Sequence, residues 1–502
     1  KPFKFKDSEA PIPLAETRKM YASLPEDMPL ERQMSNLGAS MANQPWPDEM
    51  EMFEPYVTGL MWFDTLPDKK AVIDAFEKHL WSCHRFNSCI EGSKWVRRHD
   101  KMDVEYHFEE KDMPDEKSIE ELAMKTQLTS LPRDHPQWKV FLLRSTSSQS
   151  AVLMHLHHAL GDGLGLLFAM TPLMGVEEGH PLANIPLPRA VLPPFARKAE
   201  DTNAKRRDPT AHRGFLCNCC CNFFRGIRNF LRGFFVILTT AYDSDLPINA
   251  PLGQRRPALK FSGKRRLTRL PTLPLSTVKR ARENHDVTLN DIVMAAVTGA
   301  IRRYCVHKGD TQLPEGRPVE CKSMIMLALP RECDISNPCI ALQNKMLFSS
   351  VRLPVEQGTR AGRVKKMADA CSDLKSVAYM MGLKFFTNVG AMSPRWFVNK
   401  AASETWSKHS FLITNVPSTT GPMTWPKGEG GQELKGITMV IANVMNQISV
   451  VSYNGNLYAS LVSDPDLISE EEEFCRLWLS EFEALADPTK NDTDGIARPL
   501  AA

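Results

Sequence analysis

A chain of 502 residues with 42% hydrophobic residues, 24% charged residues and a formal net charge of +3 has an ordinary globular composition. Its length predicts two lobes, because a single hydrophobic core stops growing before this size. The small net charge and the lack of a basic stripe with interleaved aromatics argue against a nucleic-acid partner. The sequence has no apolar run of about 20 residues, so it predicts no membrane-spanning helix. Twelve cysteines in a chain this long do not predict a disulfide scaffold, and eight of them are scattered, which is typical of a reducing compartment.

The first 190 residues divide into an irregular segment and a lobe with a regular pattern. Residues 1–50 are rich in proline, methionine and charge, and they predict a mostly irregular N-terminal segment. Residues 51–190 contain apolar strands and helices, and we expect them to form the N-terminal lobe. The expected elements are strands at 58–63, 138–144 and 150–158 and helices at 69–84 and 164–174.

Residues 191–250 form a predicted linker that carries an amphipathic helix. Large apolar side chains from Phe223 to Leu238 share one helical side and three arginines lie opposite. The apolar set is Phe223, Phe224, Ile227, Phe230, Leu231, Phe234, Phe235 and Leu238, and the polar set is Arg225, Arg228, Asn229 and Arg232. Such a stripe more commonly packs on the protein's own core. Its size and the opposing arginines favour a membrane interface here.

Residues 251–488 form the predicted C-terminal lobe, and residues 489–502 a disordered tail. The clearest helix runs from Thr288 to Tyr304, with Thr288 as its N-cap and Asp291 at its third position. Strands are expected at 323–329, 345–353, 411–415, 447–453 and 457–462, with a turn at Asn454-Gly455 and a last helix from Ser469. Helices and strands mix in both lobes, so the predicted class is α/β or α+β with mixed sheets.

Two adjacent histidines at the end of an apolar strand are the strongest chemical signal. His157 and His158 precede Asp162 and Gly163 by a few residues, a pattern that suits a general base held at a tight turn. Strand alternation turns His158 away from the face shared by His155 and His157. A metal site is disfavoured, because Ala159 and Leu160 stand where further ligands are needed. The spacing alone leaves a catalytic base and a hydrogen-bonded core histidine both open.

One further motif precedes the histidines and three follow them, in a fixed order along the chain. They are the strand from Trp138, the helix that opens with Asn290-Asp291, the segment Thr414-Asn415-Val-Pro417, and the hairpin from Val451 to Pro465. This ordered set, with His157-His-Ala-Leu-Gly-Asp-Gly163 as HHxxxDG, resembles the bifunctional wax ester synthase/diacylglycerol acyltransferases, which are CoA-dependent acyltransferases. The family's basic strand end is met loosely by Leu329-Pro-Arg331, and Ser418-Thr419 replaces the usual Gly-Pro. By itself, Asn290-Asp291 is explained by helix capping.

The resemblance implies a two-lobed chloramphenicol-acetyltransferase-like fold with a central tunnel. It implies an O-acyltransferase that moves a fatty acyl group from acyl-CoA, a substrate rather than a cofactor, to diacylglycerol or a long-chain alcohol. The implied catalytic residues are His158 as base, with Asp162 and His157. Asp162 would hold the turn by pairing with an unidentified arginine, and His157 would support the base. The implied substrate-binding residues are Gly163, Asn290, Asp291 and Asn415, with no metal.

The amphipathic segment predicts a peripheral membrane location. We expect the segment Phe223–Leu238 to bind a membrane or a lipid droplet at the cytosolic face, with the endoplasmic reticulum and the plasma membrane both open. Triacylglycerol and wax ester are both open as products. A non-catalytic acyl-lipid-binding protein, an acyltransferase for small or secondary-metabolite alcohols, and a metallo-hydrolase are the alternatives.

Overall fold

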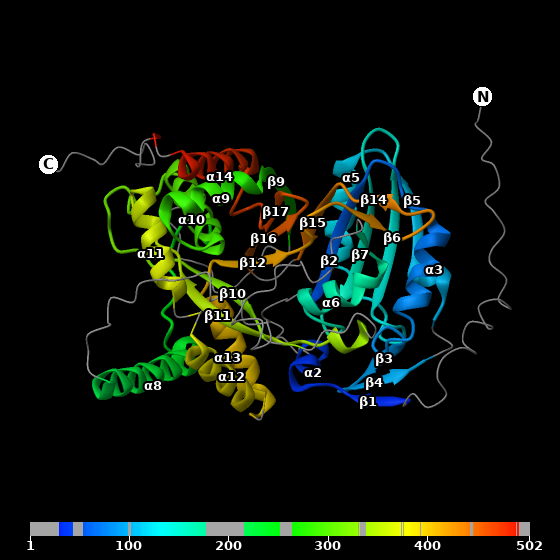
Figure 1. Cartoon of the computed structure of the whole chain (residues 1–502), viewed down its shortest axis with the longest axis horizontal. Coiled ribbons are helices and arrows are strands. Elements are labelled where there is room, and N and C mark those ends of the chain that lie inside the picture. The colour runs from blue at the N-terminus through cyan, green and yellow to red at the C-terminus, as the bar shows by residue number, and fades with distance from the viewer. Residues whose placement is uncertain are drawn as a thin grey trace.

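Two lobes lie side by side, each built around its own β-sheet (Figure 1). The computed structural model describes residues 30–43, 54–98, 102–176, 215–250, 264–329, 331, 338–372, 374, 376–391, 393–441, 445–487 and 489–490. Most of the predicted irregular segment, the linker up to residue 214 and the tail from 491 lie outside the described residues. The predicted mixed α/β class is confirmed.

The N-terminal lobe is a five-stranded sheet covered by a helix on each face. Its order is β15 (Gly436–Val440), β2 (Tyr56–Phe63), β7 (Ser150–His157), β6 (Trp138–Ser145) and β5 (Phe108–Met113), with β5 and β6 parallel. Along β2 the side chains alternate, so Met61 and Phe63 join the core under α3 (Lys69–His79), whereas Leu60 and Trp62 join the core under α5 (Glu116–Gln127).

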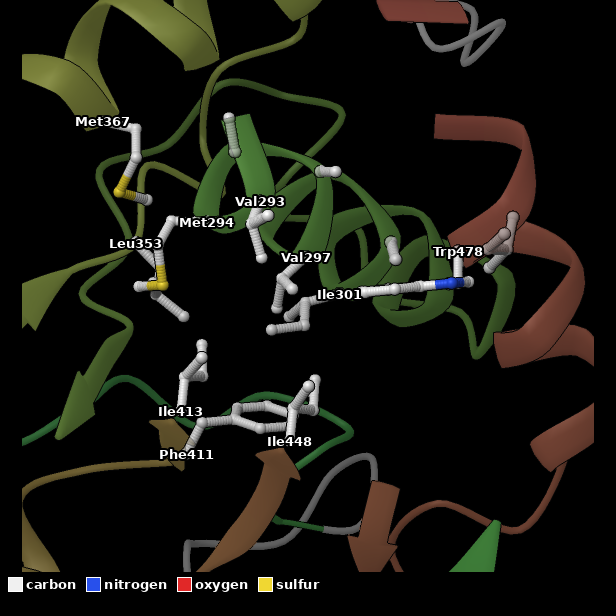
Figure 2. Close-up of a cluster of buried hydrophobic side chains, with 14 of the residues drawn as sticks. Val293, Met294, Val297, Ile301, Leu353, Met367, Phe411, Ile413, Ile448 and Trp478 are labelled. Carbon is white, nitrogen blue, oxygen red and sulfur yellow. The ribbon is translucent and has the colours of Figure 1, made fainter. Parts of the chain in front are cut away.

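The C-terminal lobe is a six-stranded mixed sheet with helices on both faces. Its order is β11 (Met346–Arg352), β10 (Lys322–Ala328), β12 (Phe411–Pro417), β16 (Asn446–Tyr453), β17 (Asn456–Ser463) and β9 (Arg266–Pro274). Helices α9 (Leu275–His285), α10 (Leu289–His307), α11 (Arg360–Ser372) and α14 (Glu471–Ala486) gather around one face. Figure 2 shows Val293 and Val297 of α10 above Phe411 and Ile448 of the sheet. The capping box predicted at Thr288 and Asp291 starts α10.

The two lobes share strands, which the sequence did not predict. In the chain, strand β15 lies between β12 and β16 of the C-terminal sheet, but it pairs antiparallel with β2, along Gly436↔Trp62 to Val440↔Thr58. Nearby, β13 (Met423–Trp425) pairs with β14 (Gln432–Glu433) and β8 (Gly175–Val176). Met423 and Trp425 are buried in the core of the N-terminal lobe. The segment 423–440 therefore fastens the lobes together.

Smaller elements complete the N-terminal lobe, several of them at its lower end in Figure 1. They are β1 (Glu31–Gln33), α2 (Asn36–Ala42), β3 (Ser88–Glu91), β4 (Lys94–Arg97), α4 (Val104–His107), α6 (Gly163–Met170) and the 3₁₀ turn η3 (Thr171–Leu173). Strands β1, β4 and β3 form a sheet of their own. Strand β1 and helix α2 lie within the segment predicted to be mostly irregular.

Helix α8 (Phe215–Thr239) contains the predicted amphipathic segment and packs against α12 (Val377–Ala391) beside α13 (Arg395–Ser407) (Figure 1). The crossing is close, because a Cβ on Gly382 would lie 2.1 Å from the carbonyl oxygen of Phe230. Phe230 and Phe234 contact Phe385 of α12. The predicted apolar stripe is therefore divided: these two phenylalanines pack on α12, and the other described members remain exposed or nearly so. No described helix is both long enough and apolar enough to cross a membrane.

Candidate active site

Strand β7 delivers His155 and His157 to a buried position under α5. His155 stacks on Tyr56, bonds Thr58 Oγ1 through Nδ1 at 2.8 Å and contacts the Thr129 carbonyl through Nε2. His157 packs edge-on against Tyr56, and its Nδ1 accepts a hydrogen bond from the Ala159 N–H at 3.0 Å. Burial lowers the pKa of His155 to about 4, and burial lowers the pKa of His157 well below its usual value. Both rings are neutral supports of the turn.

His158 lies one residue beyond the strand and is only half-buried. Its Nδ1 is 3.1 Å from Oδ1 of Asn344, and its own carbonyl accepts a hydrogen bond from Nδ2 of Asn344 at 2.8 Å. Burial lowers the pKa of His158, although the Asp162 carboxylate opposes that effect. The ring is therefore neutral near pH 7, which is the form that a general base needs.

Asp162 holds the turn through a saturated set of contacts. Its two carboxylate oxygens accept from Arg331 Nη1 and Nη2 at 2.6 and 2.7 Å. The same carboxylate caps α6 by accepting from the Gly165 N–H at 2.9 Å, and it accepts from the Lys345 N–H at 2.8 Å. Arg331 is thus the arginine that the sequence left unidentified. These four hydrogen bonds use every lone-pair direction of the carboxylate, so Asp162 is bound within the turn.

The turn between His158 and Asp162 is held on its other side by Arg85. Its Nη1 donates to the carbonyls of Ala159 and Leu160 at 3.0 and 2.9 Å. Gly165 lets the segment before β11 approach, because a Cβ there would lie 2.7 Å from the Ala341 carbonyl oxygen and 2.9 Å from Arg331 Nη1. Gly163 is less crowded, and a Cβ there would meet only Val416 at 3.8 Å.

The remaining predicted residues come from the C-terminal lobe. Val416 of β12 lies against Gly163, and its neighbour Asn415 donates to Asn290 Oδ1 at 3.4 Å. The structure therefore brings Asn415 and Asn290 together at an exposed position near the histidine turn. Asp291 is buried, and its carboxylate accepts from the Thr288 N–H in the capping box of α10. The substrate-binding roles of Asn290, Asp291, Asn415 and Gly163 stay predictions.

Two residues that contact the turn have no motif of their own in the sequence analysis. Asn344 precedes β11, and Arg85 follows α3, so both are far from His158 in the chain. An asparagine and an arginine in irregular segments carry no signal that assigns them to this turn. Arg331 had a weak signal as a loosely matching basic strand end. In the part of the chain that the structure describes, no group of three metal-ligating side chains is placed to hold an ion.

A disulfide joins Cys83, after α3, to Cys339 in η5 (Pro338–Ala341). The scattered spacing gave no sign of this bond, because the fold brings together two cysteines 256 positions apart. The bond ties the N-terminal lobe to the segment that carries Asn344.

Opening this disulfide is expected to destabilise the protein. Cys339→Ala should lower the free energy of unfolding by about 2–5 kcal/mol, since the bond restricts a long loop of the unfolded chain. The thermal unfolding midpoint measures the effect. Dithiothreitol should lower the midpoint of the native sequence and leave that of Cys339→Ala unchanged. Cys475→Ala, at an unpaired half-buried cysteine, is the control. Equal midpoints for Cys339→Ala and the native sequence would contradict the prediction.

Two models of one protein family match this chain. The wax ester synthase/diacylglycerol acyltransferase catalytic domain matches residues 69–293, and the WS/DGAT C-terminal domain matches residues 342–486. The chain belongs to the wax ester synthase/diacylglycerol acyltransferase family. This confirms the resemblance found in the motifs, and it makes the chain an acyltransferase.

Individual relatives agree with this family assignment. A wax ester synthase/diacylglycerol acyltransferase of Arabidopsis thaliana is 23% identical over 453 residues, covering 81% of this chain and 86% of the relative. A Mycobacterium tuberculosis protein named "probable diacylglycerol O-acyltransferase" is 21% identical over 438 residues, covering 82% of this chain and 86% of the relative.

The chain aligns with solved structures over the length of both lobes. The wax ester synthase/diacylglycerol acyltransferase of Marinobacter aquaeolei aligns with a TM-score of 0.57 and 17% identity, over 90% of this chain and 99% of that one. The first condensation domain of the CDA synthetase aligns with a TM-score of 0.54 and 15% identity, over 94% and 99%. The predicted two-lobed acyltransferase fold is confirmed.

Proposed function

We propose that this wax ester synthase/diacylglycerol acyltransferase moves a fatty acyl group from acyl-CoA to the hydroxyl of a lipid alcohol, with His158 as the general base. The observation that supports the base is the contact between Nδ1 of His158 and Asn344, which leaves Nε2 as the ring nitrogen available to a substrate. The names of the family relatives support diacylglycerol and long-chain alcohols as acceptors.

The chemistry proceeds by direct transfer between two bound substrates. Nε2 of His158 takes the hydroxyl proton while the alcohol oxygen attacks the thioester carbonyl of acyl-CoA. The tetrahedral intermediate then expels CoA as the thiolate, which receives the proton from the imidazolium. Holding both substrates beside one base supplies much of the rate as pre-organised geometry. We place the substrates in a tunnel between the lobes, on the sides where Gly163 faces Val416 and Asn415 meets Asn290.

A CoA-release assay tests the proposed reaction. Purified protein is given palmitoyl-CoA and either dioleoylglycerol, hexadecanol or butanol, and free CoA is measured with a thiol-reactive dye. CoA release that depends on dioleoylglycerol or hexadecanol supports the proposal. More release with dioleoylglycerol indicates triacylglycerol synthesis, and more release with hexadecanol indicates wax ester synthesis. Release with butanol alone favours a small-alcohol acyltransferase, and binding without release favours a non-catalytic lipid-binding protein. Loss of activity after a chelator is added would favour a metal-dependent hydrolase.

We also propose that the exposed apolar side chains of α8 and α12 bind a membrane or lipid-droplet surface at the cytosolic face of the cell's membranes. On α8 the exposed members are Phe224, Ile227, Leu231, Phe235 and Leu238, and on α12 they are Val377, Met381, Phe385 and Val389. Phe224 is 68% exposed and Met381 59% exposed, which is costly for large apolar groups in water. The exposed Arg225 and Arg228 lie beside them and suit anionic headgroups.

Point substitutions test this surface better than deletion, because removing α8 would also uncover α12. Replacing Phe224, Leu231 and Phe235 together by serine should weaken co-sedimentation with phosphatidylcholine/phosphatidylglycerol vesicles by about tenfold or more, since each group loses its transfer free energy. CoA release with butanol or another soluble alcohol should change less. Leu30→Ser, at a residue 67% exposed elsewhere, is the matched control. Equal vesicle binding by both variants would contradict the proposal.

A further inference from the structure

Asn344 makes a pair of contacts with one residue, His158, that together fix the orientation of its amide. Its Nδ2 lies 2.8 Å from the His158 carbonyl oxygen and 3.4 Å from the Ala159 carbonyl oxygen. Carbonyl oxygens only accept hydrogen bonds, so the group that faces them must be the amide NH₂. The amide oxygen therefore faces Nδ1 of the His158 ring, at 3.1 Å.

An oxygen acceptor at Nδ1 decides where the proton of the neutral ring lies. The Asn344 Oδ1 atom carries no hydrogen, so the contact is a hydrogen bond only when Nδ1 is protonated. The neutral imidazole then has its lone pair on Nε2, which is the nitrogen that the proposed reaction uses. In the other tautomer Nε2 would carry the proton, and it would have no lone pair to receive one from the alcohol.

We propose that Asn344 is a positioning residue that holds His158 in the Nδ1-protonated tautomer and so makes Nε2 the base. This inference rests on the proposed function of His158, and it adds a residue outside the HHxxxDG motif to that function. Asn344 is buried, and it touches the base rather than the reacting atoms.

The segment around Asn344 is fastened to the turn at several points. The Asp162 N–H donates to the Gln343 carbonyl at 3.4 Å, and the Lys345 N–H donates to the Asp162 carboxylate at 2.8 Å. Five residues upstream, Cys339 is bonded to Cys83 of the N-terminal lobe. Because Asn344 lies two residues before β11 of the other lobe's sheet, the tautomer of the base depends on a contact between the two lobes.

The choice of an amide rather than a carboxylate keeps the base neutral. The charged groups around the ring are Asp162, whose charge is paired with Arg331, and Arg85, which donates to the turn carbonyls. The remaining titratable neighbour is His157, which burial keeps neutral. A carboxylate at position 344 would add a full negative charge in contact with Nδ1, and it would stabilise the imidazolium form.

Two substitutions of Asn344 with opposite expectations test the inference. Asn344→Ala removes the side-chain acceptor and leaves the His158 carbonyl, which also interacts with the ring. We therefore expect kcat for CoA release to fall by about tenfold at unchanged KM, because part of the enzyme then has its proton on Nε2. Asn344→Asp keeps an acceptor of the same size. It should retain most of the activity at high pH and move the acidic limb of the kcat–pH profile upward by about one unit or more.

The matched control is the neighbouring variant Gln343→Ala. The Gln343 side chain bonds the Ile340 carbonyl and does not contact His158, so this variant perturbs the segment alone. It should keep kcat within about threefold of the native value and leave the acidic limb in place. Circular dichroism and the thermal midpoint establish that each variant is folded.

The outcomes separate this inference from the proposed base. An Asn344→Ala protein with native kcat, or an Asn344→Asp profile that coincides with the native one, would overturn the role of Asn344 while His158 still stands. A loss in Gln343→Ala equal to that in Asn344→Ala would reduce Asn344 to a structural part of the segment. Native activity in His158→Ala would overturn the proposed base itself. If Asn344→Ala does not fold, the volume-conserving Asn344→Asp profile still decides.

Discussion

His158→Ala is expected to lower the rate of acyl transfer by about 10²–10⁴-fold while the protein stays folded, because a positioned general base contributes that much to the rate. The ring is half-buried at the end of β7, and its Nδ1 contacts one side chain, so the substitution disturbs little packing. CoA release from palmitoyl-CoA in the presence of dioleoylglycerol or hexadecanol is the measurement. Full activity in this variant would exclude His158 as the base.

His307→Ala is the control for this prediction, since His307 lies at the end of α10 and pairs with Glu470 on the surface. It should leave CoA release unchanged. In the native protein, activity should fall as the pH falls through the pKa of His158, because only the neutral ring accepts a proton. Burial lowers that pKa, so activity should persist to more acidic pH than an ordinary histidine would allow.

The sequence predicted the elements that carry strong local patterns. The strands around His155–His158, the capped helix that begins after Thr288 and the turn at Asn454-Gly455 all stand where the apolar periodicity and turn residues indicated. Strand alternation also predicted that His155 and His157 share a face and that His158 is different. These features depend on neighbours in the chain, which a pattern can reveal.

Contacts between distant segments could not be predicted in the same way. Strand β15 reads as an ordinary apolar strand, and nothing local says that it joins β2 of the other lobe. The Cys83–Cys339 bond and the Asn344 contact to His158 span more than 180 residues each. The amphipathic stripe of α8 was recognised, but its division between α12 and solvent needed the position of α12. Propensity and spacing describe one element at a time, and these features belong to pairs.

Breaking the ion pair between Asp162 and Arg331 is expected to have the largest effect on stability. The side chains are only 7% and 1% exposed, so removing one partner leaves the other charge buried and unpaired. Arg331→Met should therefore lower the free energy of unfolding by about 3–5 kcal/mol, and Asp162→Asn should have an effect of similar size. Both should also lower kcat, because the turn that presents His158 loses its anchor. Thermal midpoints and CoA release measure the two consequences.

The double variant distinguishes the ion pair from the packing around it. With both charges removed, Asp162→Asn/Arg331→Met should be less destabilised than the sum of the single variants, since no unpaired charge is left. Its kcat should stay low, because the Asp162 carboxylate also accepts from the Gly165 and Lys345 N–H groups that shape the turn. Lys70→Met breaks an exposed pair with Asp74 and should cost less than about 1 kcal/mol. If Arg331→Met behaves like Lys70→Met, the turn does not depend on this pair, and the position of His158 must be set by Asn344 and Arg85.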